Sequence, residues 1–373
     1  MNLALSDEQE FLRDAAKGAL ARVATVAAAR EALEDPSRLP DLWPTVVEAG
    51  WPGLLIGEEH GGAGLEPFDA MLVLEECGRV LASTPLLGLL PASYLLDRGS
   101  DASCAAVAGG ERRPVLVAAR PPGDLHGGWT VEAKVGMARA DAPTIGDDGA
   151  VTGGAAWVVD APGADLLVVV GTDASGAPRA SVVAAGAATV EAVTRYDATR
   201  ALGHVTFDGA PGRRLDVDAG QLGAAWYLGQ ALLGAESLGT VQACLEMSVA
   251  YAKERFTFGR AIGSYQAIKH EITEILRRQE NARSLMFYAG WAGQDRPDEW
   301  ALAASALRSS AGHALDFAAR ATINVHGGIG ATWEHDAPLY FRRAQLSRRL
   351  LGGADDATDR VAGELFAQAH AAA

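Results

Sequence analysis

The spacing of hydrophobic residues changes twice along the chain, near residue 113 and near residue 219, and this limits the possible folds more than any other feature. Residues 1–112 carry apolar side chains at helical spacing, and Ser6 followed by Gln9 has the pattern of a helix capping box. Residues 113–218 contain short β-rich runs separated by Gly, Pro and Asp. Helical spacing returns at about residue 219 and continues nearly to the end.

These segments predict a mainly helical α+β protein with an N-terminal helical domain (1–112), a central antiparallel β-domain (113–218) and a C-terminal helical bundle (219–373). No helix alternates with the strands, which argues against a doubly wound nucleotide-binding fold. The expected strands cover residues 114–118, 129–133, 155–160, 165–170, 180–183 and 203–207. The expected helices include residues 68–80, 263–292, 297–325 and 336–350, and a last helix after Gly353.

Composition excludes several classes of function. The formal net charge of −15 argues against binding to nucleic acid or to an anionic membrane, both of which require a basic face. No apolar run approaches the 18 residues typical of a membrane span, and the N-terminus lacks the features of a signal peptide. The three cysteines are far apart, so we expect neither a metal site nor a disulfide framework, and a cytoplasmic location.

Two stretches carry residues suited to binding a phosphate-containing ligand. Residues 251–270 (YAKERFTFGRAIGSYQAIKH) place Arg255 shortly before the aromatic Phe258, and Gln266 follows eight residues later. A guanidinium group matches phosphate well because its planar fork donates two hydrogen bonds at once. Residues 324–334 (NVHGGIGATWE) contain three glycines, where a backbone can approach a ligand closely.

Together these two stretches resemble the signatures of the acyl-CoA dehydrogenase family, R-x-x-F-G…Q-A and Q-x-H-G-G-x-G-x-T-x-E. The Gly-rich connection at residues 50–65 and the helical segment at 68–80 are also similar to that family, so the resemblance covers nearly the whole chain. It implies a helix–β–helix architecture, FAD as the cofactor, an acyl-CoA substrate and an electron-transfer flavoprotein as the electron acceptor.

The resemblance also implies that FAD lies across a dimer interface. The positions that match contacts to its diphosphate and ADP portions are Arg255, Phe258, Gln266, Asn324, His326, Gly327, Gly328 and Gly330. Trp157 matches an aromatic residue that borders the flavin. Simpler interpretations remain open: Arg255 as a surface arginine paired with a carboxylate, His326 as a hydrogen-bonded structural histidine, and Trp157 as a buried strand residue.

The chain departs from the family at the positions that contact the flavin and remove the substrate proton. Residues 118–124 (AARPPGD) lack the hydroxyls and the acidic pair of the usual flavin loop. Val159 stands where relatives carry Thr or Ser. The two positions for the glutamate base fall on Gly352 and on Gly229 or Gln230, none of which is acidic. The remaining weak candidates for a base are Glu236, Asp355 and Asp356.

A chain that keeps the diphosphate elements but loses the flavin elements and the base resembles the non-catalytic type of subunit in actinobacterial heteromeric (α2β2) acyl-CoA dehydrogenases. Those assemblies act on bulky CoA thioesters such as steroid side chains, and a catalytic partner subunit supplies the glutamate. Two alternatives remain open. One is a self-sufficient homomeric FAD enzyme with a relocated carboxylate base, and the other is a flavin-free scaffold of the same fold.

Overall fold

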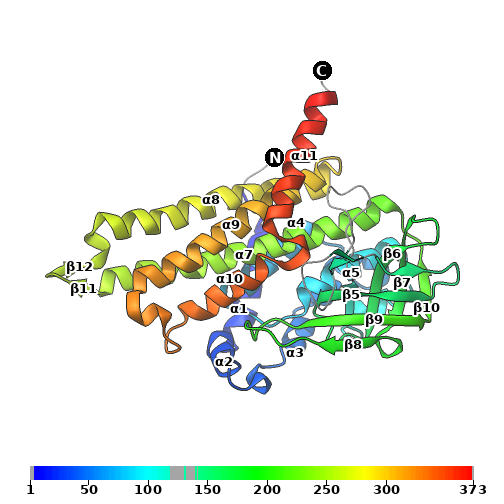
Figure 1. Cartoon of the computed structure of the whole chain (residues 1–373), viewed down its shortest axis with the longest axis horizontal. Coiled ribbons are helices and arrows are strands. Elements are labelled where there is room, and N and C mark those ends of the chain that lie inside the picture. The colour runs from blue at the N-terminus through cyan, green and yellow to red at the C-terminus, as the bar shows by residue number, and fades with distance from the viewer. Residues whose placement is uncertain (1–3, 118–129, 132–138, 141, 372–373) are drawn as a thin grey trace.

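The computed structural model describes residues 4–117, 130–131, 139–140 and 142–371. A long helical bundle lies beside a β-sheet, and a set of shorter helices covers the bundle and the sheet edge (Figure 1). The N-terminal helices are α1 (Asp7–Ala21), α2 (Thr25–Glu31), α3 (Trp43–Glu48), α4 (Pro67–Arg79), α5 (Leu86–Arg98) and α6 (Cys104–Ala108). Helix α1 begins with the predicted capping box, in which Ser6 and Gln9 each bond the backbone of the other.

The central sheet is mixed, so the prediction of a purely antiparallel β-domain is wrong in this respect. Strand β1 (Pro114–Val117) pairs in parallel with β6 (Leu166–Thr172), and a long connection between them makes this pairing possible. The other strands of this sheet are β4 (Thr144–Ile145), β5 (Val151–Val159), β7 (Pro178–Ala184), β8 (Thr189–Ala192), β9 (Leu202–Ala210) and β10 (Gly212–Leu215). Their order is β10-β7-β6-β4-β5-β9-β8, and β2 (Thr130–Val131) and β3 (Arg139–Ala140) form a separate pair.

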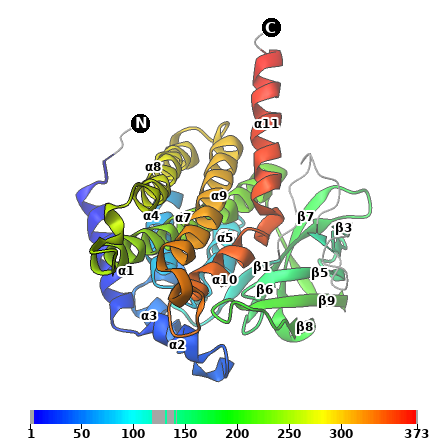
Figure 2. The same cartoon turned by 60° about the vertical axis from the view of Figure 1, so that its left-hand side comes forward.

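The C-terminal bundle contains the helices that the spacing predicted. They are α7 (Ala219–Glu254), α8 (Gln266–Asp295), α9 (Trp300–His326), α10 (Ala337–Ser347) and α11 (Gly353–Ala371). Figure 2 shows α11 projecting away from the rest of the chain. A small hairpin, β11 (Phe256–Thr257) and β12 (Arg260–Ala261), connects α7 to α8. The helix–β–helix order is therefore confirmed, while the division into domains at 1–112, 113–218 and 219–373 stays a prediction.

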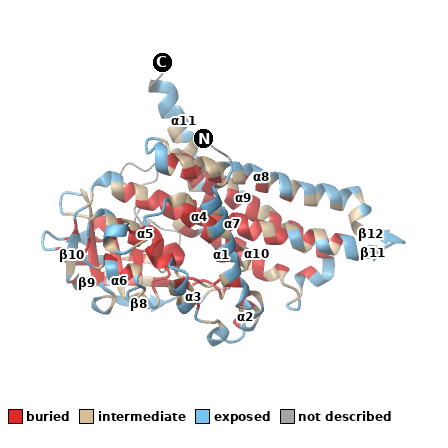
Figure 3. Cartoon of the chain, turned by 180° about the vertical axis from the view of Figure 1, so that it is seen from behind, coloured by how far each residue is buried: buried red, intermediate tan, exposed pale blue. Residues whose placement is uncertain are grey.

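Helices α4 and α7 cross with their backbones in contact at two glycines. A Cβ atom on Gly78 would lie 1.9 Å from the carbonyl oxygen of Glu236, and one on Gly239 would lie 1.7 Å from that of Glu75. No side chain larger than hydrogen fits at either position. Figure 3 shows the consequence: α4 and the middle of α7 are buried, whereas the outer face of α8, the hairpin and the end of α11 are exposed.

A buried ion cluster, which consists of Asp197, Arg200, Glu236 and Arg343, joins the bundle to the β-region. Arg343 of α10 donates to the Asp197 carboxylate at 2.8 Å and to the Glu236 carboxylate at 3.0 Å. Arg200 donates to the other oxygen of Glu236. All four side chains are at most 4% exposed. Each charge has an opposite charge beside it, although the buried Arg200 Nε has no hydrogen-bond partner in the described part of the chain, and loss of one member would leave a buried charge unpaired.

Asp160 lies beside this cluster, directly after β5, and accepts a hydrogen bond from the Gly88 amide at 2.9 Å. Burial raises the pKa of its carboxyl group to about 6, an effect that Arg200 opposes. No helix among the described residues is long and apolar enough to cross a membrane.

Removing the charge of Glu236 should destabilise the fold strongly. Glu236→Gln keeps the shape of the side chain but leaves Arg200 and Arg343 with too little negative charge, so we expect a loss of about 3–5 kcal/mol in the free energy of unfolding. Denaturant unfolding measures it. Glu246→Gln is the matched control, because Glu246 pairs with Arg79 at the surface and its loss should cost under about 1 kcal/mol. Equal, small losses in both variants would contradict the role of the cluster.

The raised pKa of Asp160 predicts a pH dependence of stability. The folded pKa of about 6 lies above the ordinary aspartate pKa of 3.8, so the folded state binds the proton more tightly. The stabilisation from this proton is lost as pH rises through 6. Relative to Asp160→Asn, the wild-type chain should gain about 1 kcal/mol between pH 7 and pH 5. Unfolding of both proteins across this range measures the difference, and parallel pH profiles would refute the assignment.

Candidate functional site

The hairpin between α7 and α8 lies at one end of the molecule (Figure 1) and carries an exposed aromatic side chain, Phe258. Phe258 and Gly259 form its two-residue turn, with φ values of +49° and +77°. Two left-handed residues are what a type I′ hairpin turn requires, and this conformation is unusual for phenylalanine. The Phe258 side chain is 93% exposed. A large apolar group held in this way indicates a surface that another molecule covers.

Arg255 and Gln266 lie at the base of the same hairpin. Arg255 directly follows α7, and its carbonyl accepts a hydrogen bond from the Ile262 amide at 2.8 Å. The Arg255 side chain is exposed. Gln266 is the first residue of α8, whose preceding residue, Tyr265, provides no side-chain cap. The bond from Ile262 holds the Arg255 backbone close to the segment that leads into α8, whose first amide groups have no side-chain cap, and uncapped amides at a helix start suit an anion such as a diphosphate.

The glycine turn follows α9 as a short 3-10 helix, Gly327–Ala331. A Cβ atom added at Gly327 or Gly328 would meet no atom within 4 Å, so both backbones are open to a ligand. Gly330 instead packs inward against α9, where a Cβ atom would lie 2.7 Å from that of His326. Asn324 donates to the Glu271 carboxylate of α8 at 3.2 Å, which holds α9 and α8 together near the turn.

His326 lies in the core beneath the glycine turn. Its Nδ1 donates to the carbonyl of Thr322 at 2.7 Å, and its ring stacks on Tyr251 with 4.4 Å between ring centroids. Burial lowers the pKa of His326, which favours the neutral ring. This geometry matches the structural interpretation of His326, because the side chain supports the turn from inside and is only 4% exposed.

Trp157 lies in β5, in the sheet, while the hairpin lies at the opposite end of the long axis (Figure 1). A β-bulge gives Trp157 a φ of +59°, its amide donates to His204 Nδ1 at 3.3 Å, and the two rings meet edge to face. Val159, two residues later, is buried and offers no side-chain hydrogen bond. The 118–124 stretch lies outside the described residues.

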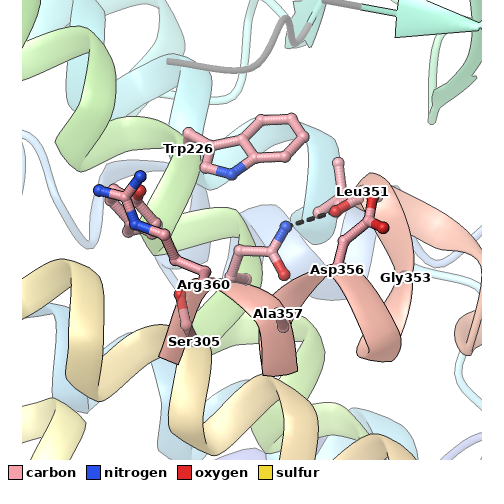
Figure 4. Close-up of a pocket in the computed structure, with 10 residues that line it drawn as sticks. Trp226, Ser305, Leu351, Gly353, Asp356, Ala357 and Arg360 are labelled. Carbon is pink, nitrogen blue, oxygen red and sulfur yellow. Dashed lines mark hydrogen bonds between the residues drawn. The ribbon is translucent and has the colours of Figure 1, made fainter. Parts of the chain in front are cut away.

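The two base positions of the family converge on one small pocket (Figure 4). Gln230 of α7 and Gly352 both line it, and Gln230 Nε2 donates to the carbonyl of Leu351 at 2.5 Å. Asp356, one turn into α11, lines the same pocket. Its free volume of about 20 Å³ has room for roughly one water molecule.

The other two carboxylates that the sequence offered as bases lie elsewhere. Glu236 belongs to the buried ion cluster, where two arginines bind both of its oxygens. Asp355 is 86% exposed, and His313 approaches it at 3.8 Å. Sequence reasoning missed other residues that line the pocket. They come from three separate helices, so no local motif identifies them: Trp226, Tyr227, Ser305, Ala357 and Arg360.

Sequence comparisons agree with this architecture. Residues 6–105 match the N-terminal domain of acyl-CoA dehydrogenases, and residues 224–364 match their C-terminal domain. The acyl-CoA dehydrogenase IpdE2 from Mycolicibacterium smegmatis is 31% identical over 97% of this chain and 100% of its own length.

Solved structures give the same result for the whole chain. The Tcur3481–Tcur3483 steroid acyl-CoA dehydrogenase has a TM-score of 0.84 and 26% identity, covering 98% of this chain and 99% of its own. A chain of the ChsE4–ChsE5 complex from Mycobacterium tuberculosis has the same TM-score and coverage at 23% identity, which supports the fold alone. These matches, with the order of elements described above, establish that the chain belongs to the acyl-CoA dehydrogenase family.

Proposed function

We propose that this chain is the non-catalytic type of subunit in a heteromeric FAD-dependent acyl-CoA dehydrogenase, which removes the α- and β-hydrogens of a CoA thioester. The observation that carries the proposal is an asymmetry along α7: one end has groups that suit a diphosphate, and the other has no carboxylate at the family's base positions. The hairpin end carries Arg255, whereas at the end near Trp226 neither Gln230 nor Gly352 is acidic and the pocket has a free volume of about 20 Å³.

The length of α7 keeps these two ends apart. Trp226, which lines the small pocket, and Arg255, which precedes the hairpin, are separated by 29 residues of helix, or about 43 Å at 1.5 Å per residue. This is longer than a single dinucleotide cofactor. The hairpin and the glycine turn would therefore contact a cofactor whose flavin rests on another chain.

The residues at the hairpin end fit the diphosphate and ADP portions of FAD. Arg255 supplies a permanent positive charge, and the first amides of α8 supply hydrogen-bond donors aligned with the helix dipole. Gly327 and Gly328 leave their backbone open, and Phe258 offers an apolar surface on the hairpin. FAD, when bound, would supply the acceptor for the hydride, while the role of this chain would be to hold and orient it.

The opposite end fits a flavin poorly. Val159 cannot donate or accept a side-chain hydrogen bond, Gly352 carries no side chain, and Gln230, which is not acidic, uses its Nε2 to bond Leu351. The proposal therefore assigns the glutamate base and the flavin contacts to a catalytic partner of the same fold. One solved relative supports this, because the similar steroid acyl-CoA dehydrogenase has two named components, Tcur3481 and Tcur3483. From the steroid acyl-CoA dehydrogenase structure we propose a bulky CoA thioester as substrate, and from the family resemblance an electron-transfer flavoprotein as electron acceptor.

A homomeric enzyme with a relocated base is the second candidate, and one observation favours it: Asp356 lines the pocket where the family places its base. The heteromer account predicts that Asp356→Asn leaves the dehydrogenase activity of the partnered enzyme within about twofold of wild type, because the partner supplies the base. Steady-state assays of the assembled enzyme measure this. Dehydrogenase activity of the purified chain alone, abolished by Asp356→Asn, would establish the homomeric enzyme instead.

Arg255→Ala should weaken FAD binding in the assembled enzyme. Loss of a charged hydrogen bond to the diphosphate should cost about 1.5–3 kcal/mol, equivalent to a rise in the FAD dissociation constant of roughly 10- to 150-fold. Flavin fluorescence during titration of the deflavinated complex measures this constant.

Arg260→Ala is the matched control for that experiment, because Arg260 lies on the same hairpin but its guanidinium covers the Tyr265 ring at 4.0 Å. We expect this variant to bind FAD nearly as tightly as wild type. An unchanged FAD dissociation constant in Arg255→Ala, or equal losses in both variants, would contradict the proposed diphosphate contact.

A further inference from the structure

We propose that Arg30, in the N-terminal helical region, is a positioning residue that holds the glycine turn in place for the cofactor. This inference rests on the proposed function, because it assumes that Gly327 and Gly328 face a cofactor. It adds a residue that lies almost 300 positions earlier in the chain and outside every cofactor motif of the sequence.

The Arg30 side chain forms hydrogen bonds with residues 333–336, which follow the glycine turn. From α2, its Nη1 donates to the carbonyls of Trp333 and His335, the latter at 3.2 Å, and its Nη2 donates to the Asp336 carboxylate. The guanidinium thus contacts three points of residues 333–336 at once. The side chain is 25% exposed, so water competes with these bonds less than at an open surface.

The segment needs such an anchor because it has few restraints of its own. Three of the five residues in Gly327–Ala331 are glycine, the residue that loses most conformational freedom when it is fixed. After this turn, the Thr332 amide bonds to Ile329 at 3.0 Å and the His335 amide bonds to Thr332 at 3.4 Å. Trp333 is 73% exposed, so its side chain contributes little packing.

A stack of rings connects the segment held by Arg30 to the hairpin end. His335 packs on His326 with 4.3 Å between ring centroids, and His326 stacks on Tyr251 at 4.4 Å. The carbonyl of Tyr251 accepts a hydrogen bond from the Arg255 amide at 2.8 Å. Arg30 therefore stands at the outer end of a continuous series of contacts that includes both parts of the proposed cofactor surface.

The imidazole ring of His335 must be neutral, because one of its nitrogen atoms accepts a hydrogen bond. Its Nδ1 accepts a hydrogen bond from the Ala337 amide at 3.0 Å, at the first turn of α10. Burial and the adjacent His326 lower the pKa of His335, an effect that Asp336 opposes and Arg30 assists. The ring thus caps α10 from the same segment whose carbonyls Arg30 binds.

Three variants of the assembled holoenzyme test whether Arg30 positions the glycine turn or only forms a surface ion pair with Asp336. Arg30→Gln removes the charge and the fork, Arg30→Lys keeps the charge alone, and Asp336→Asn keeps the two carbonyl contacts while it weakens the ion pair. We expect the FAD dissociation constant to rise at least tenfold in Arg30→Gln, to rise by an intermediate factor in Arg30→Lys, and to change less than threefold in Asp336→Asn.

Two further measurements show whether the effect is one of position. The turnover number at saturating FAD should stay within about twofold of wild type in all three variants, because the partner supplies the base. The thermal midpoint of the isolated chain should change by only a few degrees in Arg30→Gln. A wild-type FAD constant in Arg30→Gln would overturn the inference. So would FAD loss accompanied by a large drop in the thermal midpoint, because Arg30 would then serve the fold as a whole.

The Arg255→Ala variant distinguishes failure of this inference from failure of the proposed function. If Arg255→Ala weakens FAD binding and Arg30→Gln does not, the inference falls and the proposed function stands. If neither Arg255→Ala nor Arg30→Gln affects FAD, or if the wild-type assembly holds none, the proposed function falls and the inference falls with it.

Discussion

Helix α7 is a rod of 36 residues, about 54 Å long, and its length determines what one chain can do alone. One end supports the small pocket at Gln230, and the other end leads into the hairpin at Phe258. Helix α7 packs against α4 with backbone contact at Gly78 and Gly239. Within one chain the two ends are too far apart to contact the same cofactor, so the proposed site combines residues of two chains.

The ion cluster around Glu236 explains why a buried carboxylate in the middle of α7 is not a good base. A base for α-proton removal gains strength when desolvation raises its pKa and leaves an oxygen free. Both oxygens of Glu236 are instead bound by arginines, and the cluster ties α7 to α10 and to the loop before β9. The Glu236 carboxylate forms ion pairs that connect the bundle to the β-region, which explains why a charged residue is buried there.

Much of the fold was predictable because long helices leave a strong pattern. The limits of α4, α8 and α9 lie within a few residues of those that apolar spacing and Gly or Pro breaks indicated. Strand direction was not predictable, since the residues of β1 carry no signal that it runs parallel to β6. The short strands β4, β8 and β10 were not predicted, because two to four residues are too few to show an alternation of apolar and polar side chains.

For the site, motifs located the residues that are close together in sequence, such as Arg255 and Phe258. The assignment of these residues to FAD stays a prediction. Sequence reasoning could not find Arg30 or Arg360, because each reaches its site from a distant helix and only the packing brings it there. The glycine turn was recognisable from its sequence motif. The stack of rings beneath it, from Tyr251 to His335, depends on contacts between residues that are separated in the sequence.

The central claim is that a flavin site exists only when this chain meets a different catalytic chain. The most direct test is the visible absorption spectrum of the chain purified alone, and again after co-expression with a catalytic-type acyl-CoA dehydrogenase subunit from the same source. The account predicts colourless protein alone and yellow protein with about one FAD per pair of chains in the complex. Yellow protein with about one FAD per chain when purified alone would contradict it and favour a homomeric enzyme, and colourless protein in both preparations would favour a flavin-free scaffold.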